Sequence, residues 1–277
     1  MAKNSQIEWT DHTFNPWWGC TKVSPACEHC YAEAWAKRLG KKVWGKRSDR
    51  RLLSETNWAQ PLKWNAEAAQ ERQRARVFCA SMADVFEARP DLDSERARLW
   101  ELIERTPWLD WLLLTKRPQL IRDMVPWGDA WPNNVWIGTT VEDQRRAKQR
   151  LPHLVALPAA VRFISAEPLL GSLNLSPWID SLDWVIAGGE SGGGARLSDP
   201  AWFETLRDQC IDAGVAFHFK QWGDWRPVKS LRARPREIQL ANGNRMLRVG
   251  KKRAGRFLAG ATWDELPTPR PVCRAAV

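Results

Sequence analysis

The sequence predicts an α/β fold, a partial (β/α) barrel of the TIM type, with about six to seven parallel strands and a small basic β extension at the C-terminus. Short apolar runs rich in β-branched or aromatic residues recur along the chain, and each has the length of a buried strand. Helix-like segments separate most of these runs, so the repeat is roughly 20 to 35 residues, the size of a βαβ unit. No G-x-G-x-x-G turn follows the first predicted strand, which favours a barrel over a doubly wound open sheet.

The predicted elements follow from these runs and from helix-boundary residues. The predicted strands are residues 14–18, 76–80, 108–115, 135–139, 161–165, 183–187 and 215–219. Helices are predicted over 31–39, near 66–74, and over 94–105, 142–150 and 199–213, with Ser94 and Asp199 as N-caps and Gly40 and Gly214 as C-terminal stops. After residue 226 the alternation ends, and turn residues predict a hairpin of 237–240 with 245–249, then a basic loop at 251–256.

The length of the chain limits how many domains it can form, and its apolar runs indicate the cellular location that we expect. At 277 residues, the chain is long enough for one barrel with an appendage, which we place at residues 1–223 and 224–277. No apolar run is long enough to span a bilayer, and the N-terminus lacks the hydrophobic region of an export signal. We therefore expect a cytoplasmic protein with no membrane partner, whose cysteines are reduced thiols or metal ligands.

The net charge of +10 is concentrated in the C-terminal segment. From Lys220 to the end there are 14 Lys or Arg and 4 Asp or Glu, whereas the preceding residues carry 28 of each kind. Such a segment indicates a polyanion partner, with a solvated, loosely ordered tail as the alternative. The chain also has 19 tryptophans, a residue that serves both as core and as a base-stacking surface, and composition does not separate these uses.

The stretch Asn15–Ala34, NPWWGCTKVSPACEHCYAEA, contains three cysteines in the spacing C-x6-C-x2-C: Cys20, Cys27 and Cys30. Three thiolates can hold a metal and are one short of a closed tetrahedral site, so a cluster iron without a protein thiolate could bind substrate or cofactor. Two alternatives stay open. One is a structural zinc with His12 or His29 as the fourth ligand, and the other is a set of buried thiols.

Polar residues follow every predicted strand, and chemistry in a (β/α) barrel occurs at the carboxyl ends of the strands. These residues include Ser81, Asp84, Glu87, Thr115, Lys116, Arg117, Thr139, Thr140, Glu142, Asp143, Glu167, Glu190, Lys220 and the glycine-rich run 188–194. For any one of them, a helix N-cap or a solvated loop charge is the alternative explanation.

The cysteine stretch resembles the cluster loop of radical S-adenosylmethionine enzymes, in particular the branch containing spore photoproduct lyase. That branch shares the Asn-Pro-aromatic-x-Gly-Cys start and the Cys-x-x-Cys-Tyr-Ala end, although the superfamily usually spaces the first two cysteines by three residues and not by six. The whole chain also resembles an uncharacterised family of phage and bacterial proteins with this longer motif. The shared stretches are LTKRP at 114–118, SAEPLLG at 165–171, GGESG at 188–192, KQWG at 220–223 and VGKKRAGR at 249–256.

The resemblance implies cofactors and site residues. Cys20, Cys27 and Cys30 would ligate a 4Fe–4S cluster whose remaining iron binds S-adenosylmethionine, with a one-electron reductant such as flavodoxin or ferredoxin as partner. Further cofactor contacts would come from Ser81, Met82, Asp84, Thr140, Glu142, Gly188 and Gly189. The candidate catalytic residues are Cys79, Lys116 and Glu190, and a buried strand thiol is the alternative for Cys79.

The predicted substrate is a nucleic acid or a nucleotide-like molecule. Its phosphates would contact Arg117, Lys220, Lys251, Lys252, Arg253 and Arg256, while Cys210 and Cys273 have no predicted function. Two other function classes remain as alternatives. One is a non-catalytic, metal-stabilised nucleic-acid-binding phage protein, and the other is a divalent-metal hydrolase or nuclease that uses Asp84, Glu142, Glu167 and Glu190.

Overall fold

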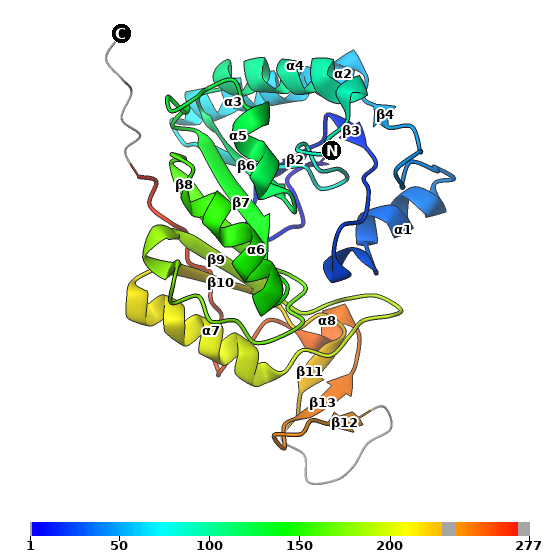
Figure 1. Cartoon of the computed structure of the whole chain (residues 1–277), viewed down its shortest axis with the longest axis vertical. Helices are drawn as coiled ribbons and strands as arrows, with labels where there is room; N and C mark the ends of the chain where they lie inside the picture. Colours follow the sequence, from blue (N-terminus) through cyan, green and yellow to red (C-terminus); the bar gives the residue numbers. More distant parts are fainter. Residues whose placement is uncertain (1, 229–236, 271–277) are drawn as a thin grey trace. The chain divides into compact units, whose positions relative to one another are not determined.

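The structure, a computed structural model of the chain, describes residues 2–228 and 237–270. Its largest sheet has eight strands in the order β1-β2-β5-β6-β7-β8-β9-β10 (Figure 1). The first, β1 (Ala2–Lys3), pairs antiparallel with β2 (His12–Phe14), and the strands from β2 onward are parallel. The chain therefore has the α/β partial-barrel fold that the sequence predicts.

The later strands lie where the apolar runs predict them. They are β5 (Ala75–Cys79), β6 (Leu109–Thr115), β7 (Val135–Thr140), β8 (Val161–Ala166), β9 (Trp184–Gly188) and β10 (Ala216–Gln221). All residues of β7 and β9 are buried, as expected for strands covered on both faces. Continuous apolar runs therefore predicted these strands well.

The first predicted strand is wrong in its extent. Residues 14–18 form not one strand but the end of β2 and a separate β3 (Trp17–Trp18), which pairs antiparallel with β4 (Arg51–Leu52). Pro16 lies between them, and because proline has no backbone N–H it cannot continue the hydrogen-bond ladder. The chain therefore leaves the large sheet shortly before Cys20.

The helices match the predictions at some boundaries and differ at others. They are α1 (Tyr31–Arg38), α2 (Glu55–Trp58), α3 (Gln60–Glu71), α4 (Asp93–Glu104), α5 (Ile121–Met124), α6 (Gln144–Val155), α7 (Pro200–Ala213) and α8 (Lys251–Ala254). The Asp199 carboxylate accepts a hydrogen bond from Ala201 N, and Gly214 ends α7 with φ 66°. The predicted Ser94 cap is wrong, because α4 already begins at Asp93.

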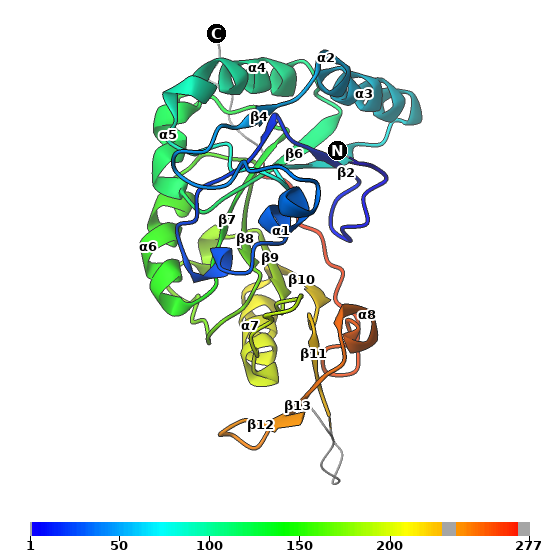
Figure 2. The ribbon, with the colours of Figure 1, turned by 90° about the vertical axis from the view of Figure 1, so that its right-hand side faces the viewer.

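The chain divides into two compact units. Among the described residues, the first comprises 2–139, 153–162 and 268–270, and the second comprises 140–152, 163–228 and 237–267. In the first unit, α2, α3 and α4 lie side by side in both views (Figures 1 and 2). In the second unit, α7 packs against β9 and β10.

Tryptophan side chains form much of the core. All 19 tryptophans fall within the described residues, 12 of them are buried, and Trp35 is the exposed one. In the first unit, Phe14 packs edge-on against Trp58 and Trp111, with ring centroids 5.1 and 5.6 Å apart. The tryptophan content is therefore explained mainly by core packing, not by a base-stacking surface.

The end of the second unit forms a small sheet with the order β11-β13-β12: β11 (Trp225–Pro227), β12 (Glu237–Gln239) and β13 (Arg245–Arg248). The antiparallel pairing of β12 with β13 confirms the predicted hairpin. The predicted basic loop at 251–256 is wrong in part, because 251–254 form the short helix α8. Cys273 and the parts of the predicted extension at 229–236 and 271–277 lie outside the described residues.

None of the helices in the described ranges has the length and apolar character that crossing a bilayer requires.

Candidate functional site

The loop that carries Cys20 is aligned on the backbone that follows β5. Asn15 is fully buried, its Nδ2 donates to Ser81 Oγ (3.1 Å), and its Oδ1 accepts from Met82 N (2.6 Å). Gly19 N donates to Met82 O at 3.0 Å and forms a parallel bridge with Ala83. The asparagine and glycine of the cysteine stretch thus hold Cys20 at the carboxyl edge of β2 and β5.

Position 19 requires glycine for two reasons. Its φ is +117°, a value that side-chain-bearing residues rarely adopt. A Cβ there would also lie 2.2 Å from the carbonyl oxygen of Val43. The residue before Cys20 therefore lets the loop approach the 43–48 segment closely.

Cys20 lies within a buried group of charges. Arg117 Nη1 lies 3.8 Å from Cys20 Sγ and 2.6 Å from Asp84 Oδ2, and its Nη2 donates to Thr21 O at 2.8 Å. Burial raises the pKa of the Cys20 thiol to about 12, with the charge of Asp84 acting in the same direction and that of Arg117 opposing it. In this arrangement Cys20 is a neutral thiol at pH 7, and a metal cation would favour its thiolate.

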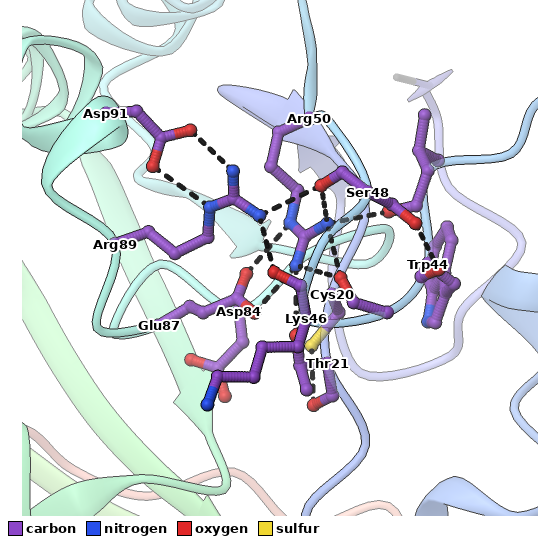
Figure 3. A network of polar contacts seen from close by, with 12 residues as sticks. Cys20, Thr21, Trp44, Lys46, Ser48, Arg50, Asp84, Glu87, Arg89 and Asp91 are labelled. Carbon is purple, nitrogen blue, oxygen red and sulfur yellow. Dashed lines mark hydrogen bonds and ion pairs between the residues drawn. The ribbon is translucent and has the colours of Figure 1, made fainter.

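Arg50 connects the cysteine loop to two neighbouring segments (Figure 3). Its guanidinium forms a double hydrogen bond with the Glu87 carboxylate, at 2.8 and 3.0 Å. It also donates to Thr21 Oγ1 and to the carbonyl oxygens of Val43, Gly45 and Ser48. The side chains of Arg50 and Glu87 are 1% and 5% exposed, so this pair is an internal support of the loop around Cys20.

The sequence did not indicate this role of Arg50. Glu87 was noted as a strand-end carboxylate, but Arg50 lies in a charged, interrupted stretch where nothing distinguishes it from neighbouring cations. The distance of 37 positions between Arg50 and Glu87 leaves no local pattern. A buried arginine that binds several carbonyl oxygens is visible only once the chain is folded.

Cys27 and Cys30 lie at the start of α1. Cys27 ends the short 3-10 helix η1 (Pro25–Cys27), and Cys30 occupies the N-cap position of α1. Both are partly exposed, and both interact electrostatically with the Lys22 ammonium. Cys30 packs against a small cluster formed by Ala32, Ala36, Val43 and Met82.

The donor set suits a sulfur-ligated metal in kind, because three thiols on one short stretch are typical ligands of zinc or of an iron–sulfur cluster. Among the described residues, no three Cys, His, Asp or Glu side chains lie close enough together to hold a single metal ion, so the cysteine loop is not a preformed mononuclear site. His12 stacks on Trp64 with ring centroids 4.4 Å apart, and its Nδ1 accepts a hydrogen bond from Asn4 N. A fourth ligand from His12 therefore has no support in the geometry.

Three other predicted residues of the first unit, Ser81, Lys116 and Cys79, take part in hydrogen bonds or are buried. The Ser81 carbonyl accepts from Tyr31 Oη at 2.7 Å, which ties α1 to the end of β5. Lys116 donates its backbone N–H to Asp84 Oδ2 at 3.2 Å, and its side chain is partly exposed. Cys79 is fully buried, and burial raises the pKa of its thiol.

The predicted residues of the second unit form separate ion pairs. Glu142 is fully buried, and its Oε2 accepts from Arg150 Nη1 at 2.7 Å, while the Thr140 carbonyl accepts from the same nitrogen at 2.8 Å. Glu190 accepts two hydrogen bonds from the Arg196 guanidinium, at 2.6 and 2.9 Å. Each predicted carboxylate is thus neutralised within its own unit.

Lys220 and the glycine-rich run also have structural partners. Lys220 Nζ lies 2.8 Å from Glu167 Oε1 and 2.9 Å from Oε2. A Cβ on Gly188 would contact the Glu167 side chain, and one on Gly189 would lie 2.1 Å from Trp222 O. The chain after β9 therefore needs glycine to approach the chain after β10, which accounts for these glycines without a ligand.

Some of the predicted phosphate contacts already pair with a carboxylate, and others are exposed to solvent. Arg117 is buried against Asp84, Lys220 is paired with Glu167, and Arg256 forms an ion pair with Asp264. Lys251, Lys252 and Arg253 on α8 are exposed. The α8 cations are therefore the predicted contacts that a phosphate could reach without displacing a carboxylate.

The family model described as "Protein of unknown function (DUF5131)" matches residues 4–267. No curated protein matches the sequence. Among solved structures, the chain is similar to a Cys-to-Ser mutant of spore photoproduct lyase, with 12% identity and a TM-score of 0.47, over 91% of this chain and 72% of that chain. It is also similar to a double mutant of spore photoproduct lyase with bound AdoMet and dinucleoside spore photoproduct, with 12% identity and a TM-score of 0.45, over 86% and 68% of the two chains.

Proposed function

We propose a function for this chain, which belongs to the family described as protein of unknown function (DUF5131): it is a radical S-adenosylmethionine enzyme. The observation that carries the proposal is the C-x6-C-x2-C loop, whose first cysteine is held at the carboxyl edge of β2 and β5 by Asn15 and Gly19. Active sites of (β/α) barrels lie at this edge of the sheet.

In this proposal Cys20, Cys27 and Cys30 hold a 4Fe–4S cluster. When bound and reduced by one electron from a partner such as flavodoxin or ferredoxin, the cluster would cleave the sulfonium C–S bond of S-adenosylmethionine into methionine and a 5′-deoxyadenosyl radical. Thiolates and not thiols bind iron. Arg117 Nη1 lies 3.8 Å from Cys20 Sγ and opposes the rise in the pKa of this thiol that burial causes, while the iron itself would favour the thiolate.

The hydrolase alternative has less support from the geometry. A divalent-metal site needs carboxylates that are free to coordinate. Each of the four candidate carboxylates has a cationic partner within hydrogen-bond distance; the pairs are Asp84–Arg117, Glu142–Arg150, Glu167–Lys220 and Glu190–Arg196. We therefore place the metal chemistry at the cysteines.

We also propose that the substrate is a nucleic acid. The supporting observations are the concentration of positive charge in the C-terminal segment and the exposed cations of α8. Cations without carboxylate partners attract the phosphates of a polyanion, and the interaction weakens with salt.

Anaerobic reconstitution of the full chain with iron and sulfide, followed by electron paramagnetic resonance of the dithionite-reduced protein, tests the cofactor. We expect a 4Fe–4S signal that changes when S-adenosylmethionine is added and that is lost in Cys27→Ser. Cys210→Ala is the matched control, because Cys210 is a buried thiol on α7 and should not affect the signal. A colourless protein that retains one zinc per chain would contradict the proposal.

A further inference from the structure

The segment that follows the cysteine loop is strongly basic. Residues 37–51 contain eight Lys or Arg and one acidic residue, Asp49. The neutrality of residues 1–219 as a whole conceals this local excess, because acidic residues elsewhere balance it. The basic segment belongs to the first unit, and it begins within α1, the helix whose N-cap is Cys30.

Most of these cations are exposed and lack a carboxylate partner. Two have other roles, since Arg50 is buried against Glu87 and Lys37 pairs with Glu33 at 2.7 Å. The other six are exposed, and none of them forms an ion pair with any described residue: Arg38, Lys41, Lys42, Lys46, Arg47 and Arg51, whose guanidinium lies over the Trp18 ring, 5.0 Å from its centroid.

The arginines elsewhere in the first unit behave differently. Several pair with a carboxylate, including Arg74 with Asp110, Arg76 with Asp11, Arg89 with Asp91 and Arg98 with Glu55. The unit therefore satisfies many of its cations internally. Exposed cations without an ion pair elsewhere in the unit, such as Lys63, Arg72 and Arg105, are scattered along the chain and do not form a run like that at 37–51. An accumulation of unpaired cations is the electrostatic signature of a surface that binds a polyanion.

The outward face of α1 adds exposed apolar side chains to this charge. Tyr31, Trp35 and Leu39 follow one another at intervals of four residues and are 61%, 50% and 46% exposed. The opposite face, with Ala32 and Ala36, packs on the small cluster that includes Met82. Trp35 is the exposed tryptophan of the 19, although a ring of this kind is usually buried.

We propose that this region, the α1 surface, binds single-stranded nucleic acid. We define the α1 surface by Tyr31, Trp35 and Leu39 together with Arg38, Lys41 and Lys42. Unpaired bases stack on the Trp35 ring, and the phosphates contact the neighbouring cations. A duplex offers its phosphates but keeps its base faces stacked, so the aromatic contact selects for single strands.

The inference rests on the proposed substrate class and locates its binding surface. It assigns the principal contact to the first unit and not to α8 of the second, which offers Lys251, Lys252, Arg253 and the exposed Phe257. The two places offer three exposed cations each, but the α1 surface has the larger ring, and the exposed Lys46 and Arg47 follow it in the same basic segment. It also starts at a candidate cluster ligand, so a bound strand lies next to Cys30 along the same helix.

Fluorescence anisotropy of a labelled oligothymidylate with the full chain tests the inference. We expect Trp35→Ala to weaken binding about tenfold and Trp35→Phe to retain most of the affinity, because phenylalanine keeps a stacking face. The double variant Lys41→Gln/Lys42→Gln should weaken binding and lower the slope of log K against log salt by about 0.7 for each phosphate that is no longer neutralised. Lys251→Gln/Lys252→Gln tests the α8 cations and should weaken binding less than the α1 double variant. Arg145→Gln/Lys148→Gln, which removes two exposed cations of α6, is the matched control and should bind nearly as wild type.

Three results would overturn the inference. They are wild-type binding by both α1 variants, loss of binding in the α8 variant alone, and no binding by the wild-type chain. Equal affinity for a duplex of the same sequence would overturn the stacking contact. Thermal unfolding of each variant excludes misfolding as the cause. The cluster signal from the reconstitution experiment is independent of these outcomes, so failure of the surface and failure of the cofactor proposal are distinguishable.

Discussion

The strand ends of the two units use buried charge in different ways. In the second unit, the predicted carboxylates pair with basic side chains: Glu190 with Arg196, and Glu142 with Arg150 and, at 3.9 Å, with Arg146. In the first unit, the Arg50 guanidinium binds Glu87 and also three backbone carbonyl oxygens and Thr21. A simple pair neutralises a carboxylate, whereas a cation that binds several carbonyls fixes the path of a loop. The difference indicates that the first unit must hold a loop, the one with Cys20, in a set shape.

The largest expected effect concerns Arg50, whose guanidinium binds several partners at once. Breaking a buried ion pair from one side leaves an unpaired buried charge and costs about 3 to 5 kcal/mol. We expect Arg50→Ala to lower the free energy of unfolding by this amount. Lys220→Ala in the second unit should cost about 1 kcal/mol, because Lys220 and Glu167 are 14% and 19% exposed and water can replace the missing ammonium.

Urea unfolding of the two variants measures this difference. Arg50→Lys refines it, since lysine keeps the charge but not the planar fork that binds the carboxylate and the carbonyls together. We expect this variant to fall between wild type and Arg50→Ala. Equal losses for Arg50→Ala and Lys220→Ala would show that the Arg50 network is no more than another ion pair.

The second expected effect concerns His218 of the second unit, a buried side chain whose ring has no hydrogen bonds of the kind that Arg50 forms. His218 on β10 is 2% exposed, and neither ring nitrogen has a hydrogen-bond partner among the described residues. Burial lowers the pKa of His218 to about 4, with Arg256 acting in the same direction and Asp264, 3.7 Å from Nδ1, opposing it. Folding thus favours the neutral ring, and the unfolded chain, with a pKa near 6.5, binds the proton more tightly.

The sign of the pH dependence follows from these two pKa values. The contribution of His218 to stability is fully present above about pH 6.5 and is lost as the pH falls toward 4, a loss of about 3 kcal/mol. Urea unfolding at pH 7 and pH 4.5 should show most of this loss in wild type and a smaller one in His218→Phe. The same decrease in both proteins would assign the acid sensitivity to the carboxylates instead.

Strands and some helix caps were predictable because their causes are local. The runs that became β7 and β9 are mostly apolar and buried throughout. Asp199 and Gly214 bound α7 through a hydrogen bond and a backbone angle within a few residues. The early end of the first strand at Pro16 also has a local cause, because proline lacks the backbone N–H that the strand would need. Local sequence patterns therefore predicted most of the architecture.

The site was less predictable because its geometry depends on distant residues. The contact of Arg117 with Cys20 joins positions 97 residues apart, and the contact of Arg50 with Glu87 has no sequence pattern. Summing charge over residues 1–219 concealed the basic segment at 37–51, since charge acts over a surface patch and not over a chain length. The three cysteines were found by spacing alone, and spacing does not state how far apart folded thiols lie.

The smallest expected effect links the cysteine loop to the α1 surface. Glu33 accepts from Lys22 at 2.8 Å and from Lys37 at 2.7 Å, so Glu33→Gln releases two cations and removes one negative charge. We expect the free energy of unfolding to fall by about 0.5 kcal/mol or less, because such surface pairs contribute little. The same substitution should raise the affinity for oligothymidylate about twofold at low salt, and this gain should vanish as salt screens the added charge. Unchanged or weaker binding at low salt would mean that phosphates do not approach α1, while a stability loss comparable to that of Arg50→Ala would mean that Glu33 belongs to the internal network around Cys20.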